Sequence, residues 1–291
     1  MKVVIATRKS ILAQKQSDIV GDMLKAKYNI DYEKFLVVTE GDKRLDVTLN
    51  KIGGKGLFTK EVEIALLRNE AEIAVHSMKD LPYDIPDGFC IAAIPDREDV
   101  RDVFVSRDGT HFKDLRQGAV IGTSSIRRGV LLKSLRQDLN IVPVRGNVQT
   151  RIQKMHDENM DGIILAAAGM KRLYMEDYIT DYFDPMVFLP AIGQGALGVE
   201  CLQNNPRLDM FRGIDDYNTR ISVEAERSFM RRLNGDCHSL IGAYSIIEGD
   251  RLYIIGTYMI GNRIIKKDIE GNIEDYRELG TTLGEKIIKG A

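Results

Sequence analysis

The sequence predicts an α/β protein with two lobes and a smaller α+β unit at its C-terminal end. Over residues 2–167, short apolar runs typical of strands alternate with longer stretches of helical periodicity. The Gly-rich segment 190–198 ends this alternation and predicts a crossover between domains. Beyond it, a helix precedes three strand-like runs and a last helix. Repeated strand–helix alternation is typical of parallel sheets with helices on both faces.

The expected elements follow in chain order. Helices are expected at 11–28, with Ser10 as N-cap, and at 58–70, and strands at 2–6, 34–39, 73–76 and 91–94. After a break at 95–99, strands are expected at 103–106, 119–121, 141–144 and 162–167, and helices at 125–136 and 148–158. The tail is expected to hold helices 222–233 and 276–289, with strands at 241–247, 252–259 and 263–269 between them.

The composition is that of an ordinary water-soluble protein, with 44% apolar residues, 29% charged residues and a net charge of -2. No apolar run approaches the roughly 20 residues of a membrane span. Residues 1–7 enter a strand-like run without signal-peptide architecture. We therefore expect a cytosolic enzyme or binding protein, with neither a membrane nor nucleic acid as a partner.

Positive charge is concentrated between residues 121 and 154, which hold seven basic residues and one acidic residue. A basic region inside a near-neutral chain indicates a local anionic ligand, and a solvated helix face is the alternative. The basic residues are Arg127, Arg128, Lys133, Arg136, Arg145, Arg151 and Lys154.

The turns after four predicted strands share one chemistry, because each places hydroxyl groups or glycine amides at a helix start with arginine beside them. These turns are 7–10, 122–128, 145–151 and 168–172. A helix N-terminus favours an anion by about 0.3–1 kcal/mol, and arginine adds bidentate pairing to carboxylate or phosphate. Since ligands of open α/β sheets bind at the carboxyl ends of the strands, the four turns predict a polyanionic ligand.

Two glycine-rich segments do not identify this anion as a nucleotide. Residues 53–60 lack the GxxxxGK[ST] order of a P-loop. Residues 193–198 match GxGxxG but continue into an apolar strand-like run rather than a clear helix. A hinge or a tight interdomain turn is the favoured interpretation of the second segment.

The three cysteines are widely spaced, which argues against a disulfide framework, and no metal-ligand cluster is visible. Cys90 and Cys201 lie in apolar strand-like runs and are expected to be buried. Cys237 lies in a polar, turn-rich loop, where a thiol can react.

The predicted strand at 73–76 leads into the adjacent pair Lys79 and Asp80, and Pro82 then stops any regular continuation. A carboxylate that faces a cationic cleft stays ionised. It would then stabilise a developing cation or pass protons. Taken alone, this segment favours the other interpretation, a surface Lys-Asp turn.

Together these motifs resemble one family, the hydroxymethylbilane synthases, also called porphobilinogen deaminases. The resemblance extends from residue 5 to about residue 242. It rests on ordered blocks at 6–10, 54–58, 74–82, 122–128, 145–151, 168–173, 190–198 and the Cys237 loop. Blocks in the right order are far more specific than any single motif.

The resemblance implies a transferase that deaminates porphobilinogen, joins four units head to tail, and releases linear hydroxymethylbilane by hydrolysis. Loss of ammonia would give an azafulvene-type cation. The product would grow on a dipyrromethane cofactor held by a thioether to Cys237. Each pyrrole brings two carboxylates, which accounts for the repeated cationic turns.

The resemblance also implies roles for residues. Asp80 would be the catalytic aspartate, which hydrogen-bonds pyrrole N–H groups and stabilises positive charge. Besides Cys237, the cofactor would contact Ser10, Lys79, Asp80, Thr123, Ser124, Ser125, Arg127, Arg128, Arg145, Gly146 and Gln194. The substrate would contact Arg8, Lys55, Phe58, Arg145, Arg151 and Arg172. For Phe58, stacking on a pyrrole and a core position at a helix start are equally open.

The family fold implies two lobes like those of periplasmic binding proteins, joined by crossovers, and a small C-terminal α+β domain that carries the cofactor cysteine. The expected boundaries are 1–97 with 192–214 for the first lobe, 98–191 for the second and 215–291 for the C-terminal domain. A monomer without a metal is expected.

The Cys237 loop departs from the family pattern at two positions. The family usually has a small residue just before the cysteine and a proline three residues after it, whereas this chain has Asp236 and Leu240. Asp236 is expected to disfavour the thiolate, and Leu240 to loosen the loop. Cofactor loading, orientation and turnover are the steps that these departures would alter.

Two other functions fit parts of the pattern. A non-enzymatic binding protein that closes on an anion explains the arginine turns, but not the loop thiol, the third domain or the Lys-Asp pair. A Schiff-base enzyme that uses Lys79 or Lys55 needs a lowered lysine pKa, which nearby cations favour and Asp80 opposes. A covalently bound chromophore would separate both from the family interpretation.

Overall fold

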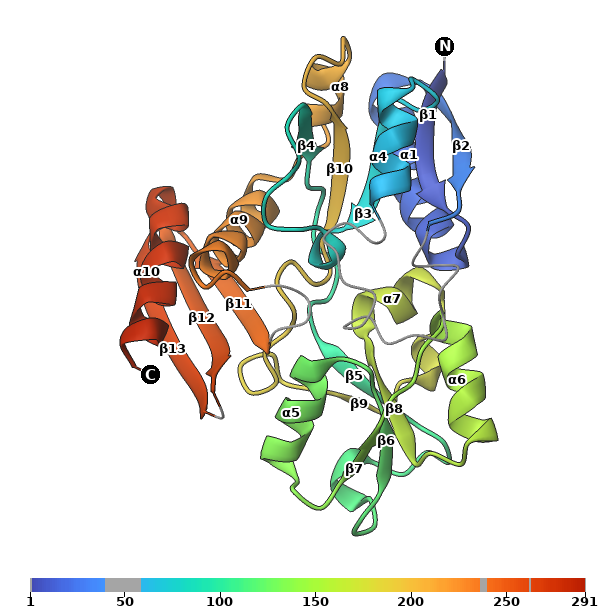
Figure 1. Cartoon of the computed structure of the whole chain (residues 1–291). Coiled ribbons are helices and arrows are strands. Elements are labelled where there is room, and N and C mark those ends of the chain that lie inside the picture. Colours follow the sequence, from blue (N-terminus) through green and yellow to red (C-terminus); the bar gives the residue numbers. More distant parts are fainter. Residues whose placement is uncertain (1, 40–58, 236–239, 262, 291) are drawn as a thin grey trace.

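Three sheets organise the protein in the computed structural model, which describes residues 2–39, 59–235, 240–261 and 263–290. Two five-stranded sheets lie one below the other in Figure 1, and the three-stranded sheet lies to their left with two helices. The upper sheet with its helices is called lobe 1, the lower one lobe 2, and the third unit the C-terminal domain.

The sheet of lobe 1 has the strand order β2-β1-β3-β10-β4. Its strands are β1 (Lys2–Arg8), β2 (Asp31–Val37), β3 (Ile73–Ser77), β4 (Phe89–Ala93) and β10 (Leu197–Leu202), and its helices are α1 (Ile11–Tyr28), α4 (Lys60–Leu67) and α8 (Leu208–Arg212). Helix α1 begins where the Ser10 hydroxyl accepts a hydrogen bond from the Ala13 amide at 3.2 Å. Its apolar side chains Val20 and Leu24 are fully buried in the same core as β1, which fixes the helix on the sheet.

The sheet of lobe 2 has the order β7-β6-β8-β5-β9. Its strands are β5 (Asp102–Ser106), β6 (Val120–Gly122), β7 (Asn140–Val142), β8 (Gly162–Ala166) and β9 (Asp181–Tyr182), and its helices are α5 (Ile126–Leu135), α6 (Val148–Asp157) and α7 (Ala167–Arg172). The side chains of Ser125 and Asn147 cap α5 and α6, so both helices start within the predicted turns 122–128 and 145–151. Short 3-10 turns occur at η1 (Met78–Asp80), η2 (Phe112–Asp114) and η3 (Glu176–Tyr178).

The prediction of parallel sheets is wrong for one central strand in each lobe. Strand β10 runs antiparallel to β3 and β4, and β5 runs antiparallel to β8 and β9. The reason is that both strands enter from the other lobe. The strands β1, β3, β6 and β8 run toward the crossovers, so a strand that arrives through a crossover runs the opposite way.

The C-terminal domain is an antiparallel three-stranded sheet packed against two helices. It comprises α9 (Tyr217–Arg232), β11 (Ile241–Glu248), β12 (Arg251–Ile260), β13 (Arg263–Asn272), the 3-10 turn η4 (Ile273–Asp275) and α10 (Tyr276–Lys289). Helix α9 begins earlier than expected because Asp216 accepts a hydrogen bond from the Thr219 amide at 2.7 Å. Its core includes Phe229 and Leu283, which are fully buried. The two lobes and the α+β unit confirm the predicted fold class, while the exact domain boundaries stay a prediction.

The two crossovers between the lobes lie side by side. The Glu98 amide donates to the Gly195 carbonyl at 3.3 Å, and the Arg97 Nε donates to the Gln194 carbonyl at 2.9 Å. Gly195 has a φ of +88°, and a Cβ there would collide with the Glu98 carbonyl. The GxGxxG segment is therefore a tight turn at the crossovers, one of the two predicted possibilities, and it is called the hinge below. Close packing of the two crossovers explains Gly195.

Candidate active site

Strand direction brings the predicted turns to the facing edges of the two lobes. The parallel strands β6, β7 and β8 place the turns that start α5, α6 and α7 at one edge of lobe 2. The parallel strands β1 and β3 place Arg8, Ser10 and the Lys79–Asp80 pair at one edge of lobe 1. Helix α7 lies between the lobes in Figure 1, and its Gly169 approaches Leu12 of α1. These edges form the candidate cleft.

The position of the Lys79–Asp80 pair is fixed by the neighbouring residue Met78. It forms η1 directly after β3, and the Met78 side chain beside it is buried. The Met78 amide donates to the Ala196 carbonyl at 3.0 Å, which ties η1 to the hinge. Asp80 is exposed and Lys79 is half-buried, so the chain fixes this pair in place while leaving the carboxylate open to a ligand.

Electrostatic coupling shows that the two edges face each other. Burial lowers the pKa of Lys79 to about 8, with Asp80 opposing this shift and Arg128 of lobe 2 adding to it. Burial also lowers the pKa of Arg151 to about 10, with Arg128 and Arg145 adding to the shift and Asp80 opposing it. The carboxylate of Asp80 thus lies among cations from both lobes, which favours the cleft over an isolated surface turn.

Arg127 and Arg128 share a buried carboxylate that sequence reasoning missed. Asp102 is 0% exposed, and its Oδ2 accepts from Arg127 Nη1 at 2.7 Å while its Oδ1 accepts from Arg128 Nη2 at 2.7 Å. Burial alone would raise the pKa of Asp102, but the two guanidinium groups outweigh it and hold this pKa well below its usual range. The signal was a lone aspartate opening an apolar strand, since a carboxylate there needs a cationic partner.

Gln194 joins this buried group to the hinge. Its side chain is 1% exposed, and its Nε2 donates to the Val100 carbonyl at 2.7 Å and to Asp102 Oδ1 at 3.1 Å. Its Oε1 is a buried acceptor without a partner among the described residues. Gln194 therefore connects both crossovers to the arginine pair behind the cleft.

The predicted hydroxyl residues organise their own turns. The Thr123 hydroxyl accepts from the Ser125 amide at 3.2 Å, and the Ser124 hydroxyl donates to the Val144 carbonyl at 2.9 Å. The Ser125 hydroxyl accepts from the Arg128 amide at 3.4 Å. Their contacts with a cofactor stay a prediction.

Two further arginines are held by backbone carbonyls near the cleft. Arg151 Nε donates to the Gly146 carbonyl at 2.8 Å, and Gly146 has a φ of +124° that favours glycine. Arg172 Nη2 donates to the Gly195 carbonyl at 2.6 Å, and burial lowers the pKa of Arg172 to about 10. These bonds orient the two guanidinium groups. Among the ion pairs of the described residues, none joins either group to a buried carboxylate.

The excess of positive charge suits a ligand that carries carboxylates. Lys79, Arg145 and Arg151 can pair with such groups, while the Gln194 Oε1 and the Asp80 carboxylate can accept hydrogen bonds from N–H donors. A dipyrromethane group offers both carboxylates and pyrrole N–H groups. The residues present therefore fit this cofactor.

Comparison with known proteins agrees with this geometry. Residues 3–210 match the family model for "Porphobilinogen deaminase, dipyromethane cofactor binding domain", and residues 220–289 match that for the C-terminal domain of the same enzyme. The chain belongs to the porphobilinogen deaminase family. The porphobilinogen deaminase of Clostridium beijerinckii is 62% identical over 288 residues, covering 99% of either chain. That of Clostridium acetobutylicum is 61% identical over 289 residues, also covering 99% of either chain. Among solved structures, the Methionine Binding Protein MetQ is similar at a TM-score of 0.47 and 10% identity, covering 73% of this chain and 89% of MetQ.

Part of the site expected of a porphobilinogen deaminase lies outside the described residues, namely Lys55, Phe58, Asp236 and Cys237. Leu240 is described, and its side chain is buried while its carbonyl accepts from the Met259 amide at 3.2 Å. The expected loosening of the loop therefore does not extend to Leu240 itself. Of the other two cysteines, Cys201 is buried as predicted, and Cys90 is half-buried with its Sγ 3.8 Å from that of Cys201.

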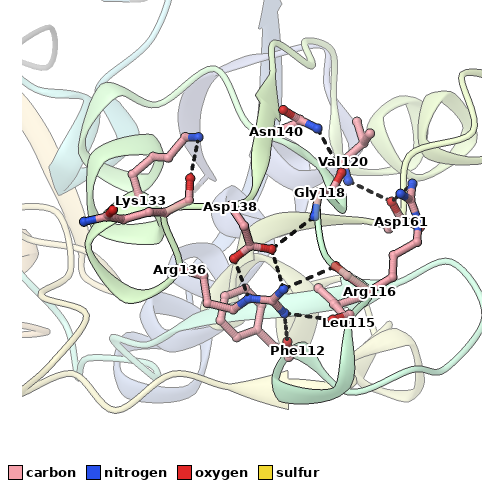
Figure 2. Close-up of polar contacts among 11 residues, drawn as sticks. Phe112, Leu115, Arg116, Gly118, Val120, Lys133, Arg136, Asp138, Asn140 and Asp161 are labelled. Carbon is pink, nitrogen blue, oxygen red and sulfur yellow. Dashed lines mark hydrogen bonds and ion pairs between the residues drawn. The ribbon is translucent and has the colours of Figure 1, made fainter.

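The basic residues of segment 121–154 fall into two groups. Some lie at the candidate cleft, and others stabilise local structure. Figure 2 shows the contacts of Arg136. Its Nη2 and Nε donate to Asp138 Oδ2 at 2.6 Å and Oδ1 at 3.1 Å, and its Nη1 and Nη2 also donate to the carbonyls of Leu115 at 3.0 Å and Arg116 at 3.2 Å. This pairing lowers the pKa of Asp138 to about 2. Lys133 donates to the Gln137 carbonyl at 3.0 Å. The anionic-ligand interpretation stays a prediction for Arg145 and Arg151. Arg127 and Arg128 pair with the buried Asp102, and Arg136 and Lys133 serve the fold.

Proposed function

We propose that this protein is a hydroxymethylbilane synthase. It deaminates porphobilinogen, condenses four units head to tail, and hydrolytically releases the linear tetrapyrrole with ammonia as the by-product. The observation that supports this most directly is an exposed Asp80, fixed on η1, among cations from both lobes. Relatives named porphobilinogen deaminase match the chain over nearly its full length.

The residues of lobe 1 act on the reacting pyrrole. The Asp80 carboxylate accepts hydrogen bonds from pyrrole N–H groups and stabilises the positive charge that develops as ammonia leaves. Because η1 is tied to the hinge through Met78, the carboxylate keeps its position while the ligand changes. Cys237 would hold the dipyrromethane cofactor, whose terminal pyrrole carbon would supply the nucleophile for the new bond.

The cations bind the carboxylates of the cofactor and of the incoming units. Lys79, Arg145 and Arg151 hold the acidic side chains next to Asp80, and Arg8 and Arg172 extend this surface along the two edges. Partial exclusion of water strengthens each pairing. Lys55 and Phe58 are proposed to contact the incoming substrate.

A cytoplasmic monomer is proposed for location and assembly. No helix of the described residues is long and apolar enough to cross a membrane. Size-exclusion chromatography with light scattering tests the assembly, and a mass well above the 32.8 kDa of one chain would contradict a monomer.

The decisive test is the intact mass of the purified protein beside that of the Cys237→Ala variant. We expect the wild-type chain to be heavier than its sequence by two linked pyrrole units, and the variant to have the bare-chain mass. A wild-type mass that stays bare after incubation with porphobilinogen would place the binding-protein interpretation first. A reducible imine at Lys79, trapped by borohydride, would instead favour a Schiff-base enzyme.

The KM for porphobilinogen is expected to rise as the pH increases through about 8. The pKa of Lys79 lies near 8 instead of its usual 10.5, so its amine loses the charge that binds carboxylates above this pH. The same shift in pKa makes the folded state more stable as the pH rises. Below pH 8 the charged amine disfavours the folded state, and this cost in folding free energy fades between about pH 8 and 10.5. Steady-state kinetics from pH 7 to 9.5 measure the effect, and Lys79→Arg, which keeps its charge, should remove it. An identical rise in Lys79→Arg would assign it to another group.

A further inference from the structure

A second group of cations lies outside the cleft, where α9 of the C-terminal domain packs against the segment that follows Asp80. It surrounds a cavity of about 290 Å³. The cavity is lined by Tyr83, Asp84, Ile85, Ile91, Arg220, Glu224, Arg227 and Arg231. The proposed reaction uses none of these side chains, so the cavity needs a separate explanation.

Arg227 is the buried member of this group. Its side chain is 4% exposed, and its Nη2 donates to the carbonyls of Pro82 at 2.7 Å and Tyr83 at 2.9 Å. Its Nη1 is buried without a hydrogen-bond partner, and no ion pair joins Arg227 to a carboxylate within the described ranges. Glu226, the residue before Arg227, does have a charged partner. Its carboxylate accepts two hydrogen bonds from Arg97, at 2.8 and 3.0 Å.

A second guanidinium group crowds the first. Arg231 Nη2 donates to the same Tyr83 carbonyl at 3.0 Å, so two cations converge on one oxygen atom. Arg231 adds to the lowering of the Arg227 pKa, of which burial is the larger cause. Two like charges this close repel each other unless an anion lies between them.

Each acidic residue of the cavity forms an ion pair with an arginine other than Arg227. Asp84 pairs with the Nε of Arg231 at 3.0 Å, but both side chains are more than half exposed, so water screens this pair. Glu224 lies 3.6 Å from Arg277, on the neighbouring helix α10. Burial lowers the pKa of Arg227, and Glu224 opposes this shift more strongly than Arg231 adds to it, but neither carboxylate forms a hydrogen bond with Arg227 Nη1.

We propose that this cavity binds a small oxyanion, which accepts hydrogen bonds from Arg227 Nη1 and from Arg231. Guanidinium groups pair with oxyanions through short, charge-assisted hydrogen bonds, and a buried cation gains most from such a partner. Since Arg227 already holds Pro82 and Tyr83, the bound anion fastens the segment after Asp80 to α9. The site is independent of the proposed reaction and needs no cofactor.

Its position is tested by anomalous diffraction from crystals of the cofactor-loaded protein soaked in selenate. We expect a selenium peak within hydrogen-bond distance of Arg227 Nη1. Selenium peaks confined to the cleft or to exposed lysines would overturn the proposal.

Its affinity is tested by calorimetric titration with inorganic phosphate at constant ionic strength. One saturable component should weaken at least tenfold in Arg231→Gln and vanish in Arg227→Gln. It should persist in Arg151→Gln, which alters the cleft, and in Arg232→Gln, a control of equal charge whose wild-type side chain pairs with Glu285 at 3.4 Å. Equal phosphate binding by Arg231→Gln and Arg232→Gln would overturn the proposal, even if Arg227→Gln does not fold.

Discussion

The Asp80→Asn variant is expected to consume porphobilinogen about 100 to 10,000 times more slowly than the wild type. Asparagine keeps the shape and one acceptor oxygen, but it removes the negative charge that stabilises the developing cation. The loss should appear in kcat rather than KM, because the carboxylate acts on the transition state. Steady-state formation of hydroxymethylbilane, followed by its absorbance after oxidation, measures the effect.

Folding of this variant should be nearly unchanged. Asp80 is exposed, and exposed substitutions usually alter the free energy of unfolding by no more than about 0.5 kcal/mol. Asp87→Asn is the matched control, since Asp87 is an exposed aspartate of the same connecting segment and should retain full activity. Wild-type turnover by Asp80→Asn would remove Asp80 from its proposed role.

The Asp102→Ala variant is expected to lose about 3–5 kcal/mol of unfolding free energy. Removing one partner of a buried ion pair leaves the other charge uncompensated, and here two guanidinium groups lose the same carboxylate. Gln194 also loses one of its acceptors. Urea unfolding followed by circular dichroism measures the change.

A matched variant separates burial from charge. Asp138→Ala also removes an arginine's carboxylate, but the Arg136–Asp138 pair is partly exposed, with side-chain exposures of 22% and 27%. Its loss should therefore be smaller, on the order of 1 kcal/mol. Equal losses in the two variants would show that burial of Asp102 is not the source of its effect.

Local sequence patterns predicted elements well where capping and periodicity act within one segment. Helix α1 begins after the predicted cap Ser10, and the bounds of α10 agree with its helical periodicity. The same patterns did not predict the direction of β5 and β10. A strand's direction depends on the end of the sheet at which the chain enters. That end is set by crossovers far along the chain.

The site shows the same division between local and distant information. The cationic turns were predictable because a hydroxyl or glycine beside arginine at a strand end has a local chemical meaning. The bonding of Arg127 and Arg128 was not, since their carboxylate comes from β5, 25 and 26 residues away in the chain. Chemistry that depends on a partner brought in by topology has no local signature.

The place of β10 between β3 and β4 also sets an order of events during synthesis of the chain. β3 and β4 leave the ribosome long before β10 does, and all the strands of lobe 2 emerge in between. Until β10 arrives, β3 and β4 each present an unpaired edge in the growing chain. The sheet of lobe 2 can form from consecutive segments, whereas that of lobe 1 must wait for a distant one. Lobe 1 contains β1, which is made before every strand of lobe 2, yet lobe 1 is the later of the two lobes to close.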